Sequence, residues 1–183
     1  SYRRSYLQFL FKQIGLPFLP IYTDLQFKIK YEPSQKDHFT IIGIGAVDNF
    51  ELNLNANETR EQQFILNYLP VNEQYNYTRG LKYTRFHKNS YTNFIFSRSK
   101  LNNTTFKYQN NDDSDPENLI LDYLSQEVEN KLRVENFYRL NGWTLNIGAG
   151  AEKVYYSNNT YNKIATPAGV FEREFQSDLD YAR

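Results

Sequence analysis

The residues of this chain that could do chemistry are two histidines and a few groups of acids. His38 and His87 both fall beside short polar turns, and neither has a second histidine or a carboxylate at metal-ligand spacing. Glu127 and Glu129 share one side of a strand, but other charges continue along that side, which is typical of a solvated wall rather than of acid–base catalysis. There is no Cys, no Gly-x-Ser-x-Gly motif and no phosphate-binding glycine loop. We therefore expect no enzyme, no metal and no cofactor.

An acidic stretch at 111–115 offers side-chain oxygens of the kind that Ca²⁺ binds. It lacks the spaced ligands, the glycine and the closing glutamate of an EF-hand loop. Asp115-Pro116-Glu117 instead resembles a helix start, with a capping acid before a proline at the first helical position. The sequence favours a polar loop that ends in a helix over a calcium site.

Composition restricts the class of protein further. Lys+Arg and Asp+Glu both number 21 in the 183 residues, so no basic surface indicates nucleic acid as a partner. Aromatic residues make up 17%, which argues against wholesale disorder. The most apolar run, 39–47, is far shorter than the roughly 18 residues of a membrane-spanning helix. Because the chain has no Met, we expect it to be a segment of a longer protein.

Alternation of apolar and polar residues predicts β-strands rather than helices. It is clearest at 25–31, 127–140 and 143–152, where the last two segments flank Asn141-Gly142, a two-residue hairpin signal. Segments 38–48 and 90–100 carry apolar residues on both parities, which leaves a bulge or burial of both faces open. The charged side of the 127–140 segment consists of Glu127, Glu129, Lys131, Arg133 and Glu135.

Short turns and long connections succeed each other along the chain. We expect hairpin turns near 33–37, 87–89 and 141–142, and long loops near 49–73, 102–124 and 157–170. Similar heptapeptides, at 63–69 and 118–124, lie in the first two long loops and indicate an internal repeat. Thr59 and Gln62 have the spacing of a helix capping box, so the first loop is expected to be partly helical.

Such a meander suits either a soluble antiparallel sheet or an outer-membrane β-barrel, whose turns are short on one side and long on the other. The expected strands, about 12 to 16 residues, are longer than the usual five or six of soluble proteins. Phe39, Tyr91 and Trp143 each follow a short turn, as an interfacial aromatic girdle requires. We therefore predict an all-β up-and-down meander, about seven to eight strands of a transmembrane barrel, with the charged side of 127–135 facing the lumen.

Several stretches resemble the barrel of TonB-dependent outer-membrane receptors of the Bacteroidetes type. The resemblance extends from about Tyr6 to Gly150, and no single motif is diagnostic. Its residues are Gly15–Pro20, Asp24–Tyr31, Ile42–Ala46, Asn53–Thr59, Leu69–Asn72, Lys107–Asp112 and Ser125–Arg133.

The resemblance implies a barrel of about 22 strands around an N-terminal plug, which imports a nutrient across the outer membrane of a Gram-negative bacterium with energy from the TonB system. No plug is expected within residues 1–183, which would form a partial barrel domain. The implied partners are outer-membrane lipid, the rest of the barrel and its plug, the TonB system, and a small-molecule or oligosaccharide substrate such as a siderophore or glycan. Two alternatives are a soluble, secreted glycan-binding β-protein and a complete eight-stranded outer-membrane barrel.

Overall fold

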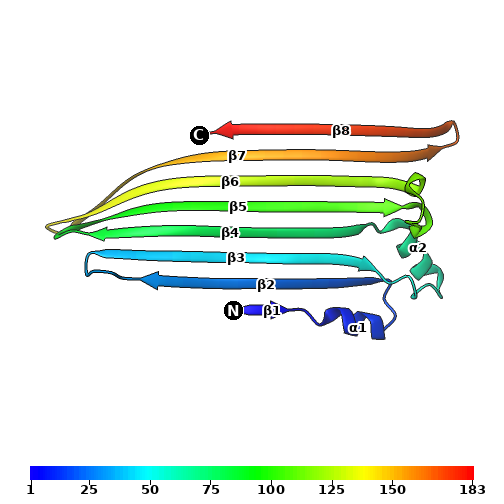
Figure 1. Ribbon diagram of the computed structural model, residues 1–183, viewed down its shortest axis with the longest axis horizontal. Coiled ribbons are helices and arrows are strands. Elements are labelled where there is room, and N and C mark those ends of the chain that lie inside the picture. Colours follow the sequence, from blue (N-terminus) through cyan, green and yellow to red (C-terminus); the bar gives the residue numbers. More distant parts are fainter.

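A computed structural model describes all residues, 1–183. The protein is one open, eight-stranded antiparallel sheet in which each strand pairs only with its neighbours in the chain (Figure 1). The elements are β1 (Tyr2–Arg4), α1 (Leu7–Gln13), β2 (Phe18–Tyr31), β3 (Asp37–Leu52), α2 (Arg60–Tyr68), β4 (Val71–Phe86), β5 (Ser90–Tyr108), the 3-10 turns η1 (Gln109–Asn111) and η2 (Pro116–Asn118), β6 (Leu119–Leu140), β7 (Trp143–Thr166) and β8 (Gly169–Ala182).

The predicted up-and-down meander with long strands is confirmed. Strands β2 to β8 are 14 to 24 residues long, well beyond the usual five or six. β1 and β8 lie at opposite edges of the sheet and do not pair with each other (Figure 1). The eight strands therefore do not close into the small barrel that was the second alternative.

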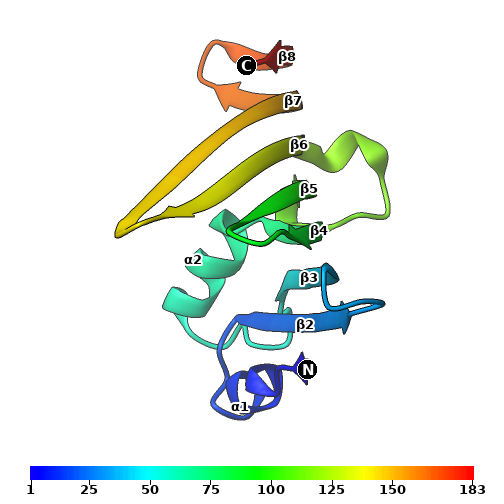
Figure 2. The same ribbon diagram turned by 90° about the vertical axis from the view of Figure 1, so that its left-hand side faces the viewer.

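The two faces of the sheet differ in what lies on them. α2 lies over one face, which we call the helix face (Figure 2). We call the opposite face, which α2 leaves uncovered, the band face, after the apolar residues described below. Apolar residues at 38–48 fall on both faces because β3 pairs with β2 and β4 without a bulge, so Ile41 lies on the band face and Ile42 on the helix face. No second sheet covers either face, unlike the layers of a sandwich.

A buried lysine holds α2 against the sheet. Lys107 of β5 is 5% exposed, and its ammonium donates to the carbonyl oxygens of Leu66 at 2.5 Å and Leu69 at 2.9 Å and to the Asn111 side chain. At the other end of α2, the Thr59 hydroxyl accepts from Gln62 N, and Gln62 Oε1 accepts from Thr59 N, which completes the capping box. Polar contacts thus fix both ends of this helix.

The prediction of a long loop near 157–170 is wrong. Residues 157–166 continue β7, and only Pro167 and Ala168 separate it from β8. Residues 157–163 have polar groups on both faces, so no apolar alternation marks this part of the strand in the sequence. The middle connection is also shorter than expected, since β5 continues to Tyr108 and β6 begins at Leu119.

The Asn141-Gly142 turn requires a backbone conformation that favours glycine. Asn141 has φ of 23° and Gly142 has φ of 86°, both positive, as in the type I′ turns of two-residue hairpins. We expect Gly142→Ala to lower the free energy of unfolding by about 1–2 kcal/mol, because a side chain is strained at positive φ. Chemical denaturation measures this loss. Gly80→Ala is the control, since Gly80 has ordinary φ and its added Cβ would meet its nearest atom at 3.7 Å; an equal loss there would contradict the turn as the cause.

Candidate functional surfaces of the sheet

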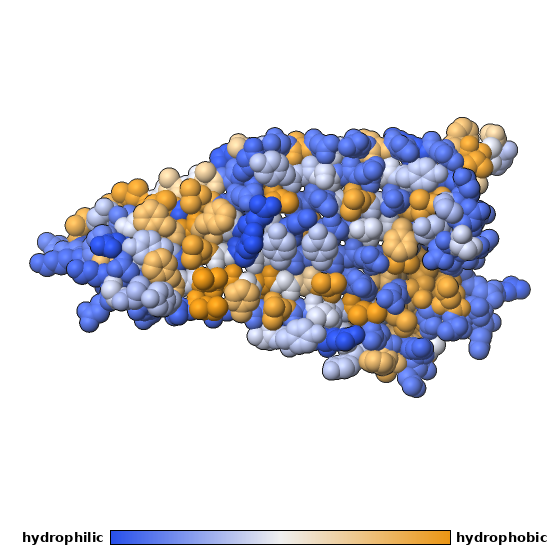
Figure 3. Space-filling model, viewed as in Figure 1, coloured by the Kyte–Doolittle hydropathy of each residue, from blue (hydrophilic) through white to orange (hydrophobic).

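Apolar side chains gather on the band face, in the part of the sheet near the short turns. Alternate residues of β7 from Trp143 to Ala151 are apolar, as are those of β3 from Phe39 to Val47, with two glycines among them. Figure 3 views this face and shows hydrophobic residues near the short-turn end of the strands, with a second group near the opposite end. We call this set the apolar band: Leu25, Phe27, Ile29, Tyr31, Phe39, Ile41, Gly43, Gly45, Val47, Leu81, Tyr83, Phe94, Phe96, Leu132, Val134, Tyr138, Leu140, Trp143, Leu145, Ile147, Ala149 and Ala151.

The apolar band is largely exposed. Leu132 is 51% exposed and Ile147 is 57% exposed, although both are large apolar residues in the middle of long strands. Monomeric soluble proteins rarely leave contiguous apolar patches of more than a few hundred Å² open to water. The band is therefore an exposed apolar surface of the kind that marks contact with a protein partner, a ligand or a membrane.

Polar groups limit the apolar band toward the short turns. The Tyr83 hydroxyl donates to Asp37 Oδ1 at 2.7 Å, and Arg85 Nη1 donates to the same oxygen at 2.8 Å. Trp143, the only Trp, lies at the end of the band and is 79% exposed. Tyrosine and tryptophan have an apolar ring and one polar group, and this combination suits a boundary between apolar and aqueous surroundings.

The three aromatic residues predicted to form a girdle do not all lie on one face. Phe39 and Trp143 lie on the band face, and Phe39 stacks on Tyr83 with ring centroids 4.8 Å apart. Tyr91 lies on the helix face, where it stacks on Phe137 at 4.5 Å. Phe39 and Trp143 therefore share a face that Tyr91 does not, because the register of β4 and β5 pairs Tyr91 with Phe86 on the helix face.

The charged residues predicted for one wall do share a face, the helix face. Lys131 Nζ lies 2.6 Å from Glu129 Oε2 and 3.3 Å from Glu152 Oε1, and Arg133 pairs with Glu135. The charges on this face thus pair with one another along and between β6 and β7, as in a solvated wall. The structure thus places on one face all five predicted residues, Glu127, Glu129, Lys131, Arg133 and Glu135.

The histidines and the acidic loop are not brought together. His38 Nδ1 lies 3.7 Å from Glu32 Oε1, and its ring packs on Phe86 with centroids 4.8 Å apart, whereas His87 lies in the next turn. Hydrogen bonds from the side chain and backbone of Ser114 lower the pKa of Asp112, and they bind its carboxylate within its own loop. No group of three His, Cys, Asp or Glu residues could hold a metal ion.

The short turns are displaced regularly along the strands. Tyr83 of β4 and Val134 of β6 lie in register with Tyr31, the last residue of β2. β4 ends at Phe86, three residues beyond, and β6 ends at Leu140, six residues beyond. At about 3.4 Å per residue and 4.8 Å between strands, the line through the turns lies at about 45° to the strands. Sequence reasoning did not find this stagger, because it depends on register.

The stagger matches the strand tilt of membrane barrels, about 35–45°. The apolar band extends over nine residues along β3 and over nine along β7. This length is close to the 9–11 residues with which a tilted strand crosses a bilayer. Beyond the band, the band face of these strands becomes polar, with Asn49 and Glu51 on β3 and Lys153 on β7. β8 pairs only with the part of β7 that begins at Lys153, outside the band, and there its acids lie on the band face.

No family model matches the chain, and no curated protein is detectably similar to it. Neither α1 nor α2 is long and apolar enough to cross a membrane.

Proposed function

We propose that this sheet is part of the wall of a bacterial outer-membrane β-barrel of the TonB-dependent receptor type, which takes up a nutrient. The observation that carries the proposal is the exposed apolar band, nine residues high on β3 and on β7, on strands staggered at the tilt of a membrane barrel. A band of this height suits contact with lipid, whereas the polar remainder of the strands would extend into water.

In this proposal the two faces have separate roles. The band face lies against outer-membrane lipid, and the charged row from Glu127 to Glu135 lines a water-filled lumen, where charges keep their hydration. The rest of the barrel would pair with the free edges at β1 and β8, since unpaired backbone groups are costly in lipid. The plug, the TonB system and a small-molecule or oligosaccharide substrate come only from the sequence resemblance.

The single tryptophan provides the test. We expect the protein, refolded into phosphatidylcholine vesicles, to show a blue-shifted Trp143 emission that lipids brominated in their acyl chains quench. Trp143→Phe combined with Asn146→Trp is the matched control, because it moves the only tryptophan to the helix face at the same end of the sheet. The control should be quenched much less.

The alternative, a soluble and secreted glycan-binding protein, predicts the opposite result of the vesicle experiment. A monodisperse, folded protein in buffer without detergent, with Trp143 emission unchanged by brominated vesicles, would refute the membrane assignment. It would favour the secreted glycan-binding protein.

A further inference from the structure

Three positive charges without acidic partners lie where the apolar band ends on β4 and β5. Arg79 and Arg98 are directly opposite each other in the register of these strands, and Lys100 is opposite Tyr77. All three are on the band face, and none forms an ion pair, whereas Lys153, also on this face, is 3.1 Å from Asp180. Like charges directly opposite in a sheet are destabilising, so this arrangement calls for an anion from outside the sheet.

Arg79 and Lys100 lie beside tyrosines outside the apolar band. The Arg79 guanidinium carbon lies 5.7 Å from the ring centroid of Tyr77, and Lys100 Nζ lies 5.5 Å from that of Tyr75. Tyr77 is two residues further from the short turns than Arg79. Tyr75 is two residues further from them than Tyr77, the residue opposite Lys100. Arginine and lysine extend in this way when their stems cover apolar surface and their charges reach a polar layer.

Arg98 is the most constrained of the three. Its Nη1 donates to Asn130 Oδ1 at 3.3 Å, while its Nε is buried and has no hydrogen-bond partner. A guanidinium has a fork of donors that matches the oxygens of a phosphate. The guanidinium groups of Arg98 and Arg79, which are opposite each other in the register, are therefore suited to an oxyanion.

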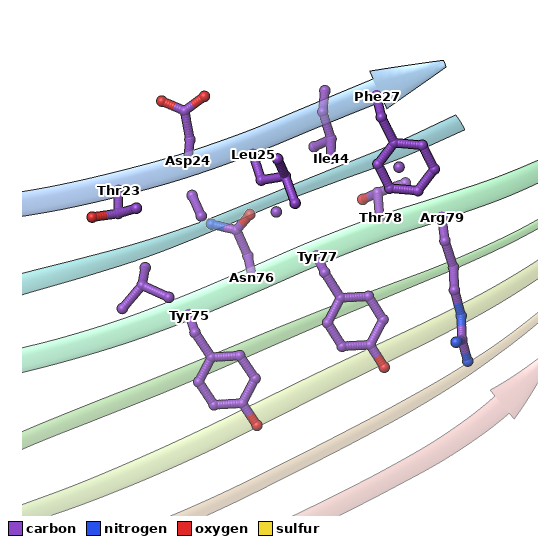
Figure 4. Close-up of a pocket in the computed structure, with 14 residues that line it drawn as sticks. Thr23, Asp24, Leu25, Phe27, Ile44, Tyr75, Asn76, Tyr77, Thr78 and Arg79 are labelled. Atoms are coloured by element: carbon purple, nitrogen blue, oxygen red, sulfur yellow. The ribbon is translucent and has the colours of Figure 1, made fainter. Parts of the chain in front are cut away.

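An apolar hollow adjoins the cations. Gly45 has no side chain, the ring of Phe27 covers Gly43, and a hollow of about 480 Å³ lies beside that ring on the β2–β4 part of the sheet. In Figure 4, Phe27 and Leu25 border it on one side and Tyr75 and Tyr77 on the other, with Arg79 at its end. Its lining could receive a hydrocarbon chain next to a bound phosphate.

We propose that Arg79, Arg98 and Lys100 bind the phosphate of an anionic membrane lipid, with an acyl chain in the hollow over Gly45. This inference rests on the proposed function, because it requires the band face to lie against a bilayer. It adds a lipid class and a site to that function: the cations that follow Leu81 on β4 and Phe96 on β5 bind a lipid headgroup.

Native mass spectrometry of the detergent-solubilised protein tests the lipid preference. Equal amounts of phosphatidylglycerol and phosphatidylcholine are added, and the retained lipid is counted. Since each cation near a membrane surface contributes about 1 kcal/mol, we expect phosphatidylglycerol to be retained at least about tenfold better. Millimolar inorganic phosphate should not displace it; displacement would identify free phosphate as the ligand and overturn the lipid assignment.

Two triple variants separate the site from total charge. Arg79→Gln with Arg98→Gln and Lys100→Gln should abolish the preference, whereas Lys28→Gln with Lys30→Gln and Lys82→Gln makes the same charge change on the helix face and should retain it. Equal loss in both variants, or equal retention of the two lipids by the unchanged protein, would overturn the proposal.

The failure of this inference can be told from failure of the proposed function. If brominated vesicles still quench Trp143 but phosphatidylglycerol is not preferred, only the lipid site is refuted. If quenching is absent in the unchanged protein, the membrane assignment itself fails. Gly45→Val, which fills the hollow without changing charge, should lower phosphatidylglycerol retention while Trp143 quenching persists; unchanged retention would refute the place given to the acyl chain.

Discussion

Ile147→Arg is expected to lower the free energy of unfolding from a bilayer by about 2–4 kcal/mol, the cost of an arginine on the lipid face near the membrane midplane. Ile147 is the central member of the β7 section of the apolar band, with two band residues on each side of it along the strand. A charge at this depth has no polar layer within easy reach. Urea unfolding from phosphatidylcholine vesicles, followed by Trp143 emission, measures the change.

The neighbouring residue supplies the matched control. Asn146 points to the helix face and is exposed, so Asn146→Arg should change the same free energy by less than about 0.5 kcal/mol. In a soluble protein Ile147 would be a surface residue, and both substitutions would then have similarly small effects. Equal values for the two variants would therefore contradict a lipid-facing band.

Lys107→Met should release α2 from the sheet with little effect on the strands. Methionine retains most of the side-chain volume but leaves the carbonyls of Leu66 and Leu69 and the Asn111 side chain without their donor. Unsatisfied buried acceptors cost about 1–3 kcal/mol, so amide hydrogens in α2 should exchange about 10- to 100-fold faster.

Hydrogen exchange resolved by residue checks this result. Lys12→Met is the control, since Lys12 is an exposed lysine in the last turn of α1 and its substitution removes the same charge. Amides at the centres of β4 to β6 should keep their protection in both variants. Unchanged exchange in α2 of Lys107→Met would show that the capping box and packing alone hold the helix.

The sheet could be predicted where its two faces differ. Apolar residues alternate with charged residues at 127–140 and with small or polar ones at 143–152, and both segments are strands. At 157–163 both faces are polar, so β7 continues without any period-2 signal and this part was expected to be a loop. Sequence periodicity detects the contrast between two environments, and it fails where a strand has water on both sides.

The face on which a residue lies could be predicted only within one strand. Glu127 and Glu135 share a face because they are separated by an even number of positions. Tyr91 and Phe39 follow different turns, and the face of each depends on the register that its turn sets. The Arg79 and Arg98 pair was missed for the same reason, since its members are neighbours only once the register of β4 and β5 is known.

The identity of strand order and chain order has a consequence for how the sheet assembles. Every strand finds its partner in the segment made just before it, so no pairing has to wait for a distant part of the chain, and the entropy of closing each loop stays small. The sheet can grow hairpin by hairpin from one edge, and the register of β2 to β7 does not depend on β8. Each newly added strand then becomes the template for the next one.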